Sequence, residues 1–214
     1  MKRVLPTLLV FFLSAASLSL GAENSAQVQI TLYPYYHHAE SAWRVTILTD
    51  GTVRYEESTI AVKVRVVTRD DATQWVERSA SLPKRLSARK LNALLTQLRV
   101  LDLATLRFGY SAAYSFTDPT SETRVTTESG QSYTTPAEVS RFVTHGATYR
   151  LTMALDSASV DSSVYAPFAA LEWKNPVHPD RSAIATIVAA WYYVLKVVGP
   201  VNGFKAKMFR PRIS

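Results

Sequence analysis

The segment from Arg44 to Glu56 constrains the fold of this chain more than any other. Two alternating runs rich in β-formers, RVTILT and TVRYE, flank the dipeptide Asp50-Gly51. Asp-Gly readily takes the positive φ angles of a tight turn, so the pattern predicts an antiparallel β-hairpin. A two-residue loop would place Leu48 opposite Val53. The fold is therefore expected to contain an antiparallel sheet.

Three further segments have the period of a strand. Apolar and polar residues alternate from Ile60 to Val66, and another strand is predicted over 74–79 after the polar turn at 69–71. The hairpin and these two runs together predict a four-stranded meander. Residues 149–155 return to a period of two and predict one more buried strand.

The period changes to that of a helix after Ser87. Leucines recur at spacings of three and four residues, which places them on one helical face, and Ser87 is a suitable N-cap. The leucines of this face are Leu91, Leu94, Leu95 and Leu98. The sequence therefore predicts a helix over 87–99, followed by a connector over 101–110.

The middle of the chain is more polar. Asp118-Pro119 predicts a turn, and the runs 123–128 and 131–135 predict a second hairpin around Ser129-Gly130. Residues 135–138 (TPAE) match a capping box with proline at the first helical position. They predict a short helix with Val139, Phe142 and Val143 on its buried stripe and Gly146 at its end. The serine-rich 156–163 is expected to be a loop, and 167–173 a short helix.

Residues 183–198 form the most apolar stretch after the N-terminus, and Lys196 is its only charge. Two interpretations are open. The segment is either a core helix packed on the sheet or, extended to 182–204, a membrane span. Its uncharged core of about 14 residues is closer to a buried helix than to a span.

The predicted architecture is a single α+β domain over 22–201, with a basic tail over 202–214. An antiparallel sheet built from 28–80 and 122–155 is covered by two or three helices. A 47% hydrophobic content excludes a disordered chain. The chain has no cysteine, so disulfides, cysteine-ligated zinc and a bacterial lipid anchor are excluded.

The N-terminus has the features of a secretory signal peptide. Lys2 and Arg3 precede an uncharged run over 4–20, and small residues follow. Cleavage near Gly21 or Ala22 is expected, and the mature protein would be periplasmic or attached to the bacterial cell envelope. Removal of Lys2 and Arg3 lowers the formal net charge from +7 to +5.

The moderate positive charge suits peripheral contact with an anionic membrane surface, and the C-terminal tail is the expected site of contact. Its basic residues are Lys205, Lys207, Arg210 and Arg212. Nucleic acid is not an expected partner, because the basic residues are not interleaved with aromatic ones.

Several of these features together resemble a bacterial exported domain family of unknown function. They are the Asp50-Gly51 hairpin with Tyr55, the leucine helix over 91–98, and the segment from Tyr114 to Asp118-Pro119. The resemblance covers about residues 28–135 and implies a small α+β fold without assigning a catalytic residue. The chain departs from the family's pattern at 33–38, where the family has paired cysteines.

One aromatic and histidine cluster is the strongest candidate for ligand binding. Exposed aromatic rings bind sugars or peptides, and imidazole binds divalent metals. The cluster comprises Tyr33, Tyr35, Tyr36, His37, His38 and Trp43. Adjacent histidines on a strand face opposite sides, so a metal site would need His145 or His178 as well. An aromatic edge strand or loop is the more conservative interpretation, and no metal or other cofactor is expected.

No recognised catalytic motif is present in the sequence. It lacks a glycine-flanked serine elbow, a phosphate-binding loop and a dinucleotide fingerprint. The paired carboxylates Glu56-Glu57 and Asp70-Asp71 are neighbours in sequence and are expected to be solvated. The favoured hypothesis is a non-enzymatic binding domain for a protein or glycan of the cell envelope. A membrane-tethered protein and a small hydrolase remain as alternatives.

Overall fold

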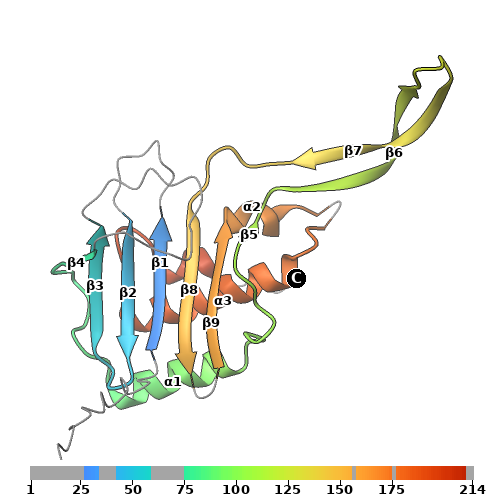
Figure 1. The fold of residues 1–214 in the computed structure, drawn as a ribbon. Helices are drawn as coiled ribbons and strands as arrows, with labels where there is room; N and C mark the ends of the chain where they lie inside the picture. The colour runs from blue at the N-terminus through green and yellow to red at the C-terminus, as the bar shows by residue number, and fades with distance from the viewer. Residues whose placement is uncertain (1–26, 34–41, 59–74, 156–157, 175–176, 211–214) are drawn as a thin grey trace, which may run out of the picture.

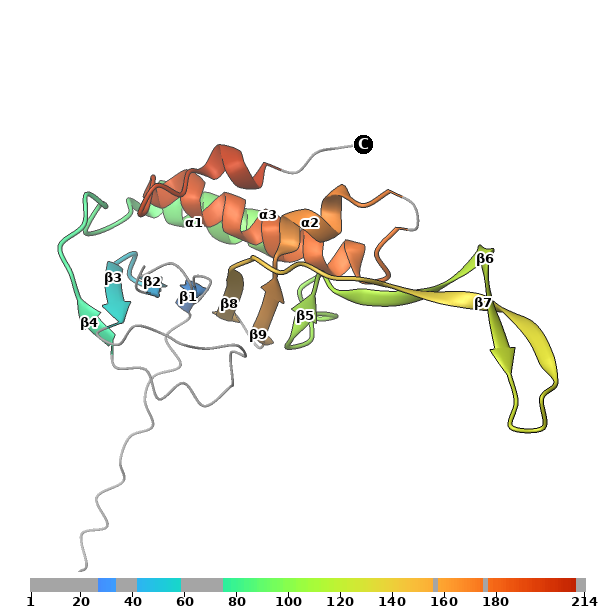
Figure 2. The same ribbon diagram turned by 90° about the horizontal axis from the view of Figure 1, so that it is seen from above.

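The protein has an α+β fold in which one sheet carries all its helices on the same face (Figures 1 and 2). The computed structural model describes residues 27–33, 42–58, 75–155, 158–174 and 177–210. Within them, a seven-stranded sheet has the order β4-β3-β2-β1-β8-β9-β5, and a separate two-stranded sheet pairs β6 with β7.

The chain starts at the central strand β1 and runs outward through β2 and β3 to β4, and β5, β8 and β9 later complete the other half of the sheet. The strands are β1 (Gln27–Tyr33), β2 (Trp43–Leu48), β3 (Val53–Ser58), β4 (Trp75–Glu77), β5 (Tyr110–Ser111), β6 (Tyr114–Thr126), β7 (Ser132–Arg141), β8 (Thr148–Leu155) and β9 (Ala158–Tyr165). The helices are α1 (Ala88–Arg99), α2 (Pro167–Glu172), α3 (Arg181–Val198) and the 3-10 helix η1 (Ala206–Phe209). The predicted strand over 60–66 lies outside the described residues.

The first hairpin is confirmed, but its register differs from the prediction by one residue. Val53 lies opposite Ile47 rather than Leu48. The loop holds three residues, because the Leu48 amide donates to the Thr52 carbonyl and Gly51 takes the left-handed φ of 85°. A three-residue loop with a left-handed glycine is a standard hairpin connection. The shift places Ile47 and Val53 together on the face that the helices cover.

The predicted helix over 87–99 is confirmed as α1. The Ser87 side chain accepts a hydrogen bond from the Lys90 amide at 3.4 Å, as expected of an N-cap. Leu94 and Leu98 are buried, and Leu91 and Leu95 are half-buried beside them. Helix α1 packs against α3, so the leucine face completes the helix layer.

The core lies between the sheet and the helices and is rich in aromatic rings. Trp191 of α3 is fully buried, with its ring centroid 5.7 Å from Trp43 of β2 and 5.1 Å from Tyr149 of β8. Phe209 of η1 stacks on Trp191 at 5.3 Å and is 1% exposed. The chain up to Arg210 is therefore part of the packed domain, which corrects the expectation of a free tail from residue 202.

The opposite face of the sheet is polar, and two of its arginines are paired with carboxylates. Arg44 binds Glu56 with Nε 2.7 Å from Oε2, and Arg150 binds Asp161 with Nε 2.9 Å from Oδ1. Thr31 lies between the two arginines in the register of β1. The hydrogen bond to Asp161 raises the pKa of Arg150. The charges of Arg44 and Arg150 are therefore neutralised locally, whereas Arg54 of β3 is exposed on this face.

The prediction of a loop over 156–163 is wrong, because residues from Ala158 onward form the strand β9. Val160 and Val164 of this strand are buried in the core, while Asp161 and Ser163 alternate with them on the polar face. Small polar side chains suit that second face, so the serine content reflects a half-polar strand. The predicted strand over 149–155 and the short helix over 167–173 are confirmed as β8 and α2.

The helix predicted from the capping box is also wrong. Residues 135–138 lie within β7, which pairs with β6 along its whole length. A capping box contributes only about 1 kcal/mol, whereas the strand pairs the backbone groups of ten residues. Pro136 has no amide to donate, which an edge strand tolerates. Gly146 ends no helix, and an added Cβ there would approach Ala166 Cβ to 2.6 Å.

Candidate functional site

A long β-hairpin projects from the body of the protein and is the most distinctive feature of the surface. We call residues 114–141, which comprise β6 and β7, the arm. In the part of the chain that the structure describes, its two strands pair only with each other. Figures 1 and 2 show the arm extending well past the sheet and helices, and Figure 2 shows its distal part turning away from the proximal part.

The two faces of the arm differ in polarity. Cross-strand pairs place Phe116 beside Val139, and Val125 beside Tyr133, on one face. We call the apolar residues of this face the arm stripe. They are Tyr114, Phe116, Val125, Tyr133, Ala137 and Val139. The other face carries serine, threonine and charged residues, and those on β7 are all exposed. The arm is therefore an amphipathic ribbon.

The bend in the arm coincides with a break in strand pairing. The register shifts between Asp118 and Glu122, so the predicted turn at Asp118-Pro119 is an irregularity inside β6 and not a chain reversal. Asp118 Oδ1 accepts hydrogen bonds from the Thr120 amide at 2.9 Å and hydroxyl at 2.7 Å. These bonds lower the pKa of Asp118. The carboxylate thereby stabilises the local turn.

The base of the arm is held by aromatic contacts to the segment between α2 and α3. The Tyr114 ring lies 4.6 Å from the His178 ring and 5.5 Å from the Trp173 ring. The Arg141 guanidinium lies 5.6 Å from the Phe116 ring and 5.5 Å from the Trp173 ring. Both strands of the arm are therefore anchored where they leave the body.

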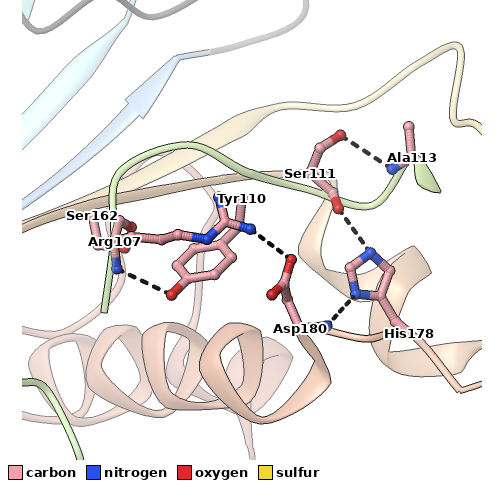
Figure 3. Close-up of polar contacts among 7 residues, drawn as sticks. All are labelled: Arg107, Tyr110, Ser111, Ala113, Ser162, His178 and Asp180. Carbon is pink, nitrogen blue, oxygen red and sulfur yellow. Dashed lines mark hydrogen bonds and ion pairs between the residues drawn. The ribbon is translucent and has the colours of Figure 1, made fainter. Parts of the chain in front are cut away.

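Hydrogen bonds continue this anchorage beneath the aromatic layer (Figure 3). His178 is 2% exposed, and its Nε2 lies 2.9 Å from the Ser111 carbonyl. The Asp180 amide donates to His178 Nδ1 at 3.0 Å. An Nδ1 that accepts from an amide leaves Nε2 to donate to the carbonyl, so both nitrogens are engaged. His178 thus links β5 to the start of α3.

Arg107 supports the same region from the other side (Figure 3). Its guanidinium binds Asp180 with an Nη2–Oδ2 distance of 2.8 Å and lies 4.4 Å from the Tyr110 ring. The Tyr110 hydroxyl accepts from the Arg107 amide at 3.0 Å, and Ser162 donates to the Arg107 carbonyl at 2.7 Å. The segment before β5 is therefore tied to both β9 and α3.

This arrangement suits presentation of the arm better than acid–base chemistry. The imidazole of His178 is enclosed and engaged at both nitrogens, so it has no free nitrogen to bind a metal or a substrate. Among the described residues, no group of three histidine, aspartate or glutamate side chains is placed to hold a metal ion. The geometry offers an anchored base and a projecting ribbon.

The structure separates the aromatic residues predicted to bind a ligand. Trp43 is 2% exposed and lies in the core, because β2 directs it toward Trp191. Tyr33 is 4% exposed and lies at the end of β1, a central rather than an edge strand, with its ring 6.3 Å from Trp75. Neither ring is available as a surface platform. Tyr35, Tyr36, His37 and His38 lie outside the described residues.

The basic residues predicted at the C-terminus are exposed where the structure describes them. These are Lys205, Lys207 and Arg210. Arg212 lies outside the described residues. The three described residues flank or belong to η1, so their positions are held by the packing of Phe209 in the core.

The arm and its base were not singled out as a site by the sequence. The second hairpin was predicted, but its extension through 114–141 was hidden by the capping box and by Asp118-Pro119. One signal was available, since Phe116, Val125, Tyr133 and Val139 are isolated apolar residues in a run of serine and threonine. Such sparse alternation is typical of a ribbon with one apolar face.

We compared the chain with known protein families, curated proteins and solved structures. No protein-family model, no curated protein and no solved structure matches this chain.

Proposed function

We propose that this protein is an exported, non-enzymatic binding protein of the cell envelope, and that the arm holds a protein partner. The observation that carries the proposal is the projecting amphipathic ribbon on an anchored base. Export is supported by the signal-peptide pattern at the N-terminus.

The shape of the arm favours recognition of a partner. An isolated two-stranded hairpin is only marginally stable in water, because it cannot bury its less polar face. The arm stripe has no element of the described body packed over its distal half, and Tyr133 there is 52% exposed. A partner that covers the stripe would supply the missing burial.

The chemistry of the arm favours a protein partner over a glycan. Tyr133 is the one aromatic residue of the distal half, whereas flat sugar-binding platforms use several exposed rings. Strand edges can also pair with the backbone of another protein. The arm carries four acidic residues against two basic ones. We therefore expect the partner surface to be apolar with a basic rim.

The anchored base would lower the cost of binding. Contacts of Tyr114 and Arg141 with Trp173 orient the arm before a partner arrives. A preorganised element loses less conformational freedom on binding than a flexible loop does.

A membrane tether is the second candidate, because α3 is long and apolar enough to cross a bilayer. Half of this helix is buried inside the described body. Membrane insertion would remove Trp191 and its neighbours from the core. We therefore favour the role of α3 as a core helix.

Site-specific photocrosslinking in the native compartment tests the proposal. A benzophenone amino acid is placed at Tyr133 on the arm stripe or at Thr134 on the opposite face of the same strand. The two positions differ in face but not in distance from the body, so Thr134 is the matched control. We expect a discrete protein adduct from position 133 and at least about tenfold less from position 134.

Equal adduct yield from both positions, or no protein adduct from position 133, would overturn the proposal. Binding of a purified adduct partner is then measured with Tyr133→Ser and with Thr134→Ser. The first substitution should weaken binding and the second should not.

A further inference from the structure

The surface of the helix layer carries positive charge that no acidic residue in its own segments offsets. Two stretches of the chain contain no aspartate or glutamate. Residues 78–101 contain six basic side chains, and residues 181–210 contain five. The first stretch leads from β4 through α1, and the second comprises α3 and η1.

The two stretches lie on the same side of the sheet. Both α1 and η1 pack against α3, and Figures 1 and 2 place all three behind the sheet. We call their exposed basic residues the basic layer. They are Arg89, Lys90, Arg99, Lys196, Lys205, Lys207 and Arg210, and we include Arg78, Lys84 and Arg85 of the segment that leads from the edge of the sheet into α1.

Most of this charge is not neutralised within the described part of the chain. Arg78 and Arg85 approach Glu57 and Asp50 only at 4.0 Å, and these pairs are exposed to solvent. Arg44 and Arg150 on the opposite face of the sheet are instead each held by a carboxylate within 3 Å. Among the described residues, basic side chains without a close carboxylate are thus more numerous on the helix side than on the opposite face, where Arg54 is one.

Exposed apolar residues accompany the charge. Val100 follows Arg99 at the end of α1 and is 74% exposed, and Met208 follows Lys207 in η1 and is 51% exposed. Basic side chains beside exposed apolar ones are typical of surfaces that bind membrane interfaces. Duplex nucleic acid is bound mainly through phosphate contacts, which account for the basic residues but not for the exposed aliphatic ones.

We propose that the basic layer docks on an anionic phospholipid bilayer, with η1 and α1 as the contact elements. The basic tail predicted from the sequence is then one part of a larger surface. The arm leaves the molecule at the β5 side of the sheet, so the proposed membrane contact and the proposed partner contact use different elements.

Vesicle co-sedimentation of the full chain purified without its predicted signal peptide tests the proposal. Vesicles contain phosphatidylcholine alone, or phosphatidylcholine and phosphatidylglycerol in about equal amounts. We expect binding only to the second type, and release when the salt concentration rises from about 0.1 M to about 0.5 M.

Variants that each remove two charges separate the effect of the basic layer on vesicle binding from the effect of net charge. Lys205→Gln with Lys207→Gln, and Arg89→Gln with Lys90→Gln, each remove two charges from the layer. Each charge near the membrane strengthens binding by about fivefold, so each double variant should bind about 25-fold more weakly. Arg54→Gln with Arg124→Gln removes two exposed charges from the sheet face and the arm, and should change binding less than twofold.

Three results would overturn the proposal. One is equal binding to both vesicle types, and another is equal weakening by all three double variants, which would show a net-charge effect only. The third is tighter binding to a DNA duplex than to the anionic vesicles at the same salt concentration. Thermal unfolding of every variant checks that the fold is retained.

Discussion

The body and the arm of this protein are built from similar strands but are stabilised in different ways. In the body, β1, β2 and β8 each pair on both sides and bury an apolar face under α3. In the arm, β6 and β7 have only each other. The body therefore depends on tertiary packing, whereas the arm depends on cross-strand pairs and on its anchored base. A region that is not needed for the core is available for binding.

The largest effect is expected from Trp191→Ala, which tests the packing of the body. Trp191 is fully buried and contacts Trp43, Tyr149 and Phe209. Truncation of a buried tryptophan lowers the free energy of unfolding by about 3–5 kcal/mol. Urea denaturation measures the change. A loss below about 1 kcal/mol would mean that α3 is not the centre of the core.

Alkaline pH is expected to have an intermediate effect on the free energy of unfolding of the body. Burial raises the pKa of Tyr149 to about 12. The folded-state pKa lies above the unfolded value, so the contribution of Tyr149 is present below about pH 10 and is lost as pH rises toward 12. The loss is on the order of 2 kcal/mol.

Tyr149→Phe removes the ionisable hydroxyl and should flatten the decline in stability between about pH 10 and pH 12. Urea denaturation of both proteins at a series of pH values gives the comparison. Tyr192→Phe, a half-buried tyrosine of α3, serves as the control. Identical pH profiles for the wild type and Tyr149→Phe would contradict the predicted contribution.

The smallest effect on stability is expected from shortening the arm. Residues 118–137 are replaced by Asn-Gly, which closes a tight hairpin between Thr117 and Glu138, a pair already in register. The base contacts of Tyr114 and Arg141 remain. The free energy of unfolding of the body should change by less than about 0.5 kcal/mol, as measured by urea denaturation. A loss of more than about 2 kcal/mol would show that the arm belongs to the cooperative core.

Local signals predicted the body better than the arm. The hairpin around Gly51 and the helix capped by Ser87 agree with their patterns, because turn and cap preferences act over a few residues. The predicted hairpin register was wrong by one residue, since the loop holds three residues with Gly51 in the left-handed region. In the arm, the capping box at Thr135 predicted a helix that β6, at least ten residues away, prevents by pairing.

The candidate site was less predictable than the fold. Trp43 was assigned to a binding surface together with the preceding tyrosines, but its strand directs it into the core. The base of the arm joins Tyr114 to Trp173 and His178, which are distant from it along the chain. Contacts of this kind depend on the path of the backbone, and no local period encodes them.

The sequence alone determined the α+β class, the first hairpin, the helices α1 and α3, and the basic character of the C-terminal segment. Those features follow from periodicity, turn chemistry and charge, which act locally. Only the tertiary structure decided that β7 is a strand, that Trp43 and Phe209 are buried, and that the arm projects from an anchored base. Each of these depends on partners distant in the chain, because burial and strand pairing are properties of the assembled fold.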